Sequence, residues 1–174
     1  VYDKEGKDQE NRETKGVVSM FRLLIVDDEY YVRVGIKSAI DWSEIGVEVV
    51  GEAADGEEAL EMALSSRPDI ILTDVRMPFM DGLTLMERLR SKMPECGFIV
   101  LSGHNEFEYA RQAIRQGAFA YLLKPIDRQE LKDTVFAAMK KMQDNRSARE
   151  YYEVLSGEYF ELQQRFLQSL LKIS

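Results

Sequence analysis

The chain has 174 residues, 45% of them hydrophobic and 31% charged, which is enough for one globular core with some segments left over. Its formal net charge of -8 offers no basic surface for nucleic acid, and no apolar run reaches the roughly 20 residues that a membrane span needs. The single cysteine, Cys96, excludes an internal disulfide, and the single histidine, His104, excludes a histidine-rich metal site. We therefore expect a cytoplasmic protein that binds any divalent ion through oxygen ligands.

Residues 1–19 are polar and lack an apolar period, so we interpret them as an artificial leader or a natural arm that precedes a native start at Met20. From Met20 onward, short apolar runs rich in β-branched residues alternate five times with amphipathic helical stretches. The predicted strands are residues 21–26, 47–53, 70–73, 98–101 and 119–122, and the predicted helices are residues 31–40, 57–65, 83–92, 106–116 and 128–142.

The predicted strands are apolar nearly throughout, which is typical of parallel strands buried on both faces. We predict an α/β domain over residues 20–143 with a doubly wound five-stranded parallel sheet in the flavodoxin-like order 2-1-3-4-5. In such sheets ligands bind outside the carboxyl ends of the strands.

The tail, residues 144–174, has apolar residues at a 3-4 spacing, which predicts a helical linker or dimer contact, although an ordinary helix packed on the domain fits equally well. Gly157 is expected to interrupt this helix. The apolar residues of the stripe are Tyr152, Leu155, Tyr159, Leu162 and Phe166.

Acidic residues follow two strands that the predicted order makes neighbours. Asp27 and Asp28 come directly after the first strand, and Asp74 ends the third. These carboxylates would repel one another, and a hard cation such as Mg²⁺ would relieve that repulsion. Acids at loop starts also serve as ordinary helix caps and turn residues, and we prefer that interpretation for Glu29 alone. For Asp27, Asp28 and Asp74, spacing by itself leaves open both a metal site and ordinary caps or turns.

The fourth and fifth strands end in a hydroxyl and an ammonium group, Ser102 and Lys124. Each alone is most simply a cap or a solvent-facing side chain. Together with the acids, however, they provide the groups needed to receive a phosphoryl group: Asp74 as the nucleophile, a metal ion on Asp28 and Asp74, and two groups that contact the phosphoryl oxygens.

These residues resemble the receiver domain of two-component response regulators over residues 20–143. The similarity includes the acidic pair Asp27-Asp28, the stretch from Asp74 to Gly82 with the pattern Asp-x-x-Met-Pro-x-Met-Asp-Gly, Leu101-Ser102-Gly103, and Lys124-Pro125, all in the family's order. The nine-residue pattern is far more specific than any single acid.

The resemblance implies that Asp74 accepts a phosphoryl group from a sensor histidine kinase. It also implies that Asp27, Asp28 and Asp74, with the backbone carbonyl of Arg76, hold Mg²⁺. Arg76 and His104 occupy positions that, in the family, tune the lifetime of the phosphoryl group. A partly exposed loop residue is the simpler interpretation of His104.

Ser102 and Lys124 become phosphate contacts by the same resemblance, and Tyr121 fills the family's aromatic switch position. A half-buried tyrosine on an edge strand is an equal alternative for Tyr121. The Lys124-Pro125 peptide bond is expected to be cis, although only about 5% of X-Pro bonds in folded proteins are.

Residues 41–53 are similar to the subgroup whose receiver is followed by an AraC-type helix-turn-helix domain. No basic recognition helix occurs before Ser174, so we expect the chain to be a receiver with a linker that leads to an output domain outside it. DNA would then be bound only through that domain, a homodimer is possible, and no membrane contact is expected.

Two other functions compete with this one. Aspartate nucleophiles with Mg²⁺ also occur in phosphohydrolases of the haloacid dehalogenase type, but these have the nucleophile after the first strand and a second aspartate two residues later. Here the candidate nucleophile follows the third strand, and position 76 is Arg. A receiver-like interaction module that is never phosphorylated would lack site residues, and none of the family's is missing.

Overall fold

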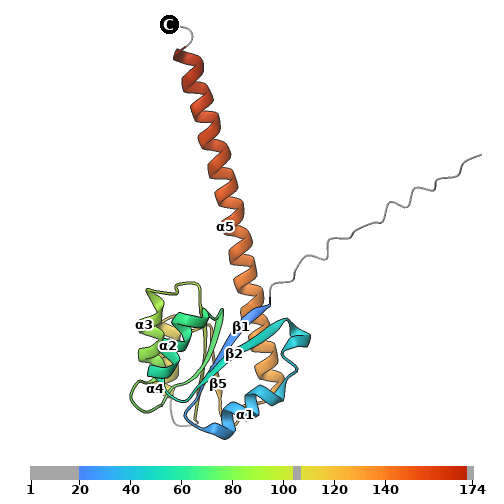
Figure 1. The fold of residues 1–174 in the computed structure, drawn as a ribbon, viewed down its shortest axis with the longest axis vertical. Helices are drawn as coiled ribbons and strands as arrows, with labels where there is room; N and C mark the ends of the chain where they lie inside the picture. The colour runs from blue at the N-terminus through green and yellow to red at the C-terminus, as the bar shows by residue number, and fades with distance from the viewer. Residues whose placement is uncertain (1–19, 104–106, 172–174) are drawn as a thin grey trace, which may run out of the picture.

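The computed structural model describes residues 20–103 and 107–171, with a five-stranded parallel sheet at its centre (Figure 1). The polar residues 1–19 and His104 lie outside the described residues. The order β2-β1-β3-β4-β5 confirms the predicted topology. The strands are β1 (Phe21–Val26), β2 (Val47–Ala53), β3 (Ile70–Asp74), β4 (Gly97–Ser102) and β5 (Ala120–Leu123).

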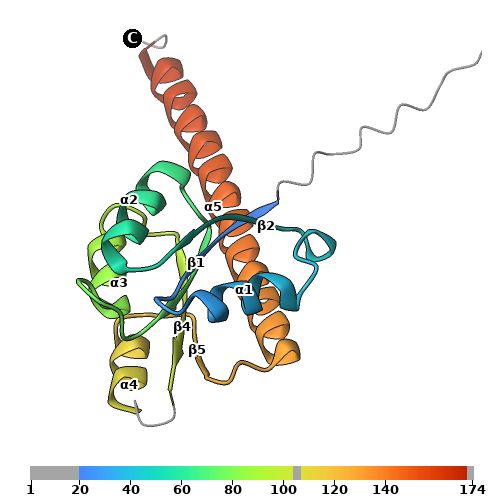
Figure 2. The same ribbon diagram turned by 60° about the horizontal axis from the view of Figure 1, so that its bottom comes forward.

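Helices cover both faces of the sheet, as Figures 1 and 2 show. The helices α2, α3 and α4 pack on one face, and α1 and α5 pack on the other. A 3-10 turn, η1 (Ser43–Ile45), precedes β2 and is not indicated by the apolar pattern. The helices are α1 (Tyr30–Ala39), α2 (Gly56–Ser66), α3 (Gly82–Arg90), α4 (Phe107–Arg115) and α5 (Arg128–Leu171).

The two faces of the sheet support separate apolar clusters, because successive residues of a strand point in opposite directions. In β1, Leu24 and Val26 belong to the cluster under α2, α3 and α4, whereas Leu23 and Ile25 belong to the one under α1 and α5. All five residues of β3 are buried. The strand β3 is therefore buried up to its end, where Asp74 lies.

The helix α5 continues without a break from Arg128 to Leu171 and passes through Gly157. The prediction that Gly157 interrupts the tail helix is therefore wrong. A glycine in an exposed helix interior costs only about 1 kcal/mol relative to alanine, which good helix formers on either side can outweigh. Within the described parts of the chain, no helix combines the length and the apolar character needed to cross a bilayer.

Candidate functional site

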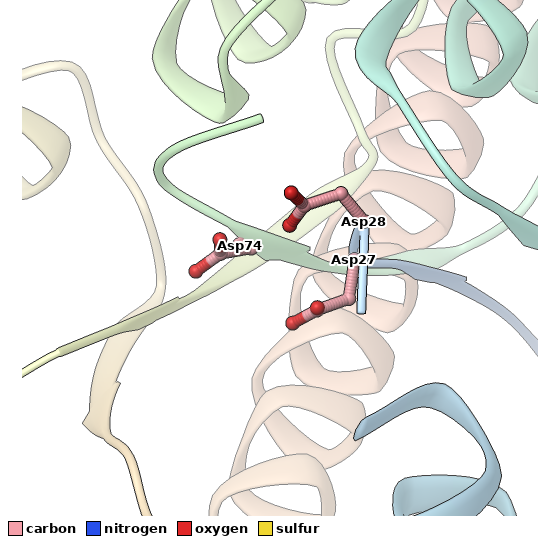
Figure 3. A group of neighbouring side chains, drawn as sticks. All are labelled: Asp27, Asp28 and Asp74. Atoms are coloured by element: carbon pink, nitrogen blue, oxygen red, sulfur yellow. The ribbon is translucent and has the colours of Figure 1, made fainter. Parts of the chain in front are cut away.

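Three carboxylates gather at the carboxyl end of the sheet. The strands β1 and β3 are hydrogen-bonded neighbours with Val26 opposite Thr73, so the residues that end them lie side by side. The carboxylates of Asp27, Asp28 and Asp74 each offer a ligand atom within 4.8 Å of the others, and Figure 3 shows them pointing to the same side of the strand ends. The predicted convergence of these residues is confirmed.

Their environments differ. Asp27 is fully buried and Asp74 is only 6% exposed, whereas Asp28 is open to solvent. Oδ1 of Asp27 accepts a hydrogen bond of 2.9 Å from the backbone N–H of Glu29, which holds its carboxylate in a tight turn after β1. The cluster therefore has two buried carboxylates with an exposed one beside them, and a small cation could enter from the side of Asp28.

Lys124, directly after β5, reaches across the sheet edge to the acids. Its Nζ lies 2.7 Å from Oδ2 of Asp27 and 3.3 Å from Oδ1 of Asp74. Its backbone N–H donates to the carbonyl of Ser102 at 2.7 Å, and its peptide bond to Pro125 is cis, as the family resemblance implied. The lysine is therefore held at both its backbone and its ammonium group beside the candidate nucleophile.

Burial and mutual repulsion make the carboxylates reluctant to ionise. The pKa of Asp74 is raised to about 6, chiefly by burial, while Lys124 lowers it and the negative charges of Asp27 and Asp28 raise it. Burial also raises the pKa of Asp27. For Lys124, burial lowers the pKa, but the carboxylates of Asp27 and Asp74 outweigh that effect, so its pKa is raised and the ammonium stays charged.

A divalent cation fits this set of charges. Three carboxylates lie close together, and the ammonium group of Lys124 contacts two of them, Asp27 and Asp74. Oxygen atoms in this spacing are the ligands that hard cations prefer. The residues that could hold such a cation are Asp27, Asp28 and Asp74, and Arg76 lines the same surface pocket as Asp28.

The loop after β3 fits closely around Asp74. A Cβ atom on Gly82 would lie 2.1 Å from the carbonyl oxygen of Asp74, closer than any real contact, so only glycine allows this approach. The carboxylate of Asp81 caps α3 by accepting from the N–H of Thr84 at 2.7 Å. The terminal Asp-Gly of the nine-residue pattern therefore positions the backbone of the candidate nucleophile.

Ser102 and Tyr121 meet at the ends of β4 and β5. Ser102 is fully buried and follows Leu101, which is opposite Asp74 in the sheet. Its hydroxyl shares a hydrogen bond of 2.8 Å with the hydroxyl of Tyr121. The bond links the last residue of β4 to a half-buried aromatic ring on the edge strand.

Two contributions to the site are not evident from the residue types alone. Glu29 occupies the N-cap position of α1 without a capping hydrogen bond, and its carboxylate lies 3.7 Å from the ammonium group of Lys124. Gly82 is essential for its close approach to Asp74. The glycine in the nine-residue pattern indicated that Gly82 has a structural role. Nothing in the sequence indicated that Glu29 contacts Lys124.

Comparison with known proteins agrees with this arrangement. A family model described as the response regulator receiver domain matches residues 23–136. The chain is 42% identical over 112 residues to the uncharacterized transcriptional regulatory protein YesN of Bacillus subtilis, covering 64% of this chain and 30% of that protein. It is 36% identical over 112 residues to the transcriptional regulatory protein HptR of Staphylococcus aureus, covering 64% of this chain and 44% of that protein. The chain thus spans less than half the length of these relatives.

Solved structures share the fold. The REC domain of AraT, a response regulator from Geobacillus stearothermophilus, is 49% identical with a TM-score of 0.70, and the match covers 73% of this chain and 98% of that one. A two component transcriptional regulator AraC from Clostridium phytofermentans is 36% identical with a TM-score of 0.68, over 72% of this chain and 98% of that one.

Proposed function

This chain belongs to the response regulator receiver domain family, and we propose that it is a switch that accepts a phosphoryl group on Asp74. The observation that carries the proposal is the position of Lys124, whose ammonium group lies 3.3 Å from Asp74 and 2.7 Å from Asp27. A cation at that place is close enough to pair with the oxygens of a phosphoryl group carried by Asp74.

The carboxylate of Asp74 would act as the nucleophile. With a pKa of about 6 it is mostly ionised at neutral pH, and burial keeps it poorly hydrated. One of its oxygens forms a bond to phosphorus while the bond from phosphorus to the histidine nitrogen of a sensor kinase breaks, and that nitrogen keeps the electron pair. The product is an acyl phosphate on Asp74.

Other residues of the site would favour this step by handling charge. The proposed Mg²⁺ ligands are Asp27, Asp28, Asp74 and the backbone carbonyl of Arg76, and the ion would shield the incoming phosphoryl oxygens from the carboxylates. Lys124 would pair with one phosphoryl oxygen, and the hydroxyl of Ser102 would donate to another.

Movement of Ser102 toward the phosphoryl group would change its hydrogen bond with Tyr121, which makes these two residues the proposed switch. In this proposal the chain is not an enzyme with a separate substrate, since it catalyses only its own phosphorylation and dephosphorylation.

The output lies outside this chain in the same proposal. The relatives are named as transcriptional regulators and are more than twice as long as the matched segment. We propose that α5 leads to an AraC-type domain that binds DNA, with a sensor histidine kinase as the upstream partner and the cytoplasm as the location. In this proposal residues 1–19 are a leader or arm, and residues 144–174 are the linker.

Incubation with acetyl phosphate and Mg²⁺, followed by intact-mass measurement, tests the function. We expect the mass to increase by one phosphoryl group, and we expect no increase in Asp74→Asn or when a chelator removes the metal. Asp144→Asn, an exposed acid on α5, is the matched control and should be phosphorylated like the unmodified chain. An unchanged mass with a competent donor would favour an interaction module, and steady release of phosphate that survives Asp74→Asn would favour a phosphohydrolase.

A further inference from the structure

The part of α5 that extends beyond the sheet has an apolar surface that no described residue of the chain covers. Figures 1 and 2 show the helix leaving the domain as a straight rod. The last described ion pairs between α5 and the rest of the chain join Arg146 to Asp69 and Arg149 to Glu95. Every described side chain from 150 to 165 is exposed, and the helix extends roughly 30 Å past Arg149.

Large apolar residues follow a 3-4 spacing along this rod. Tyr152 and Tyr159 are each 69% exposed, and Leu155 and Leu162 are 41% and 64% exposed. The spacing corresponds to positions a and d of a heptad, which form one stripe along a helix that pairs with another helix. In the sequence the same spacing continues to Phe166 and back to Ala148, and none of these six positions is charged. These six residues are called the seam below.

We propose that the seam pairs with the seam of a second copy of this chain to form a two-stranded coiled coil. An isolated helix of this length is only marginally stable in water, and most helix stability in proteins comes from burying an apolar face, which the described residues do not provide for this segment. A two-fold pair buries the same face of both copies. The proposal does not depend on phosphorylation of Asp74.

The residues around the seam fit this occupant. Gly157 lies at the outward position f, where a Cβ atom would meet nothing within 4 Å, so the weakest helix former of the segment does not interrupt the contact. Glutamates 150, 153 and 161 also lie at outward positions, and Glu158 and Gln163 flank the seam. Two exposed apolar residues, Val154 and Phe160, lie at outward positions as well, but they do not continue the 3-4 spacing that makes the seam.

A groove in the domain continues the seam toward the sheet. It is lined by Pro94 and Glu95 before β4 and by Asn145, Ala148 and Arg149 of α5. Ala148, the first residue of the seam, thus lies in this groove. A partner helix that follows the seam would enter this groove. The proposed contact would then continue onto the part of α5 that is packed on the domain.

Matched substitutions on the same rod test the proposal. Leu162→Glu and Tyr159→Glu place a charge in the seam, whereas Val154→Glu and Phe160→Glu place the same charge at outward positions that are 60% and 61% exposed. Sedimentation equilibrium should show a dimer for the unmodified chain at concentrations on the order of 100 μM. The seam variants should weaken dimerisation by roughly a hundredfold or more, because each puts two carboxylates into the dimer contact. The outward variants should change it by no more than a few-fold.

Far-UV circular dichroism at a series of concentrations gives a second readout. Helix content should rise with concentration in the unmodified chain and in the outward variants, and should stay constant in the seam variants. Thermal unfolding of the domain should be alike in all variants at concentrations too low for dimerisation, since the substituted side chains are exposed beyond it. A monomeric unmodified chain would overturn the proposal and leave the stripe for another partner. A dimer that persists in both seam variants would also overturn it, by showing that another face makes the contact.

Discussion

Replacing Asp74 by asparagine should stabilise the protein when no metal ion is present. The substitution keeps the size of the side chain and removes a buried negative charge that lies beside Asp27 and Asp28. The pKa of Asp74 is raised from 3.8 to about 6 in the folded protein. Each unit of pKa difference corresponds to about 1.4 kcal/mol, so the ionised carboxylate should reduce the free energy of unfolding by about 3 kcal/mol above pH 6.

The sign of the pH dependence follows from proton binding. Between about pH 4 and pH 6 the folded protein binds the proton of Asp74 more tightly than the unfolded chain does, so the contribution of Asp74 to stability falls as the pH rises through this window. Below the window the carboxyl is neutral in both states. The difference between Asp74→Asn and the unmodified chain should therefore be small near pH 4 and reach its full value near pH 7.

Urea denaturation from pH 4 to pH 8 with a chelator measures this difference, with Asp144→Asn as the surface control. Added Mg²⁺ should stabilise the unmodified chain by about 2.7 kcal/mol at a hundredfold excess over its dissociation constant, and should stabilise Asp74→Asn less. A lower stability of Asp74→Asn at pH 7 without metal, or a difference that does not change with pH, would contradict this prediction.

Two further substitutions test the contacts around the site. Lys124→Ala leaves buried carboxylates without their ammonium group. It should lower the free energy of unfolding by about 3 kcal/mol in a chelator and by less in Mg²⁺. The control Lys37→Ala removes an exposed ion pair and should lower the free energy of unfolding by at most about 1 kcal/mol. Equal losses in urea denaturation would contradict the assigned role of Lys124. Gly82→Ala should destabilise the protein by roughly 2 kcal/mol or more and abolish phosphorylation, because its Cβ would displace the backbone of Asp74. The control is Gly35→Ala, where a Cβ meets nothing within 4 Å. It should stabilise α1 by about 1 kcal/mol and should show normal phosphorylation in an intact-mass measurement. Normal phosphorylation of Gly82→Ala would refute the proposed contact.

The amino-acid pattern by itself determined the type and order of the main elements. Strand and helix periods are local properties, and strands that are apolar on both sides, such as β3, have to be covered on both faces. The parallel order then requires the carboxyl ends of β1 and β3 to lie together, which is why Asp27, Asp28 and Asp74 could be placed at one edge before any distance was known.

Only the tertiary structure decided how the side chains meet. The distance from Lys124 to the acids depends on the path of the chain after β5, and the contact of Gly82 with Asp74 depends on how the loop folds back over β3. The continuity of α5 through Gly157 likewise opposed the expectation from helix propensity. A local preference of about 1 kcal/mol is small beside the combined effect of the good helix formers along a long helix, whereas side-chain distances are set by packing between segments that are far apart in sequence.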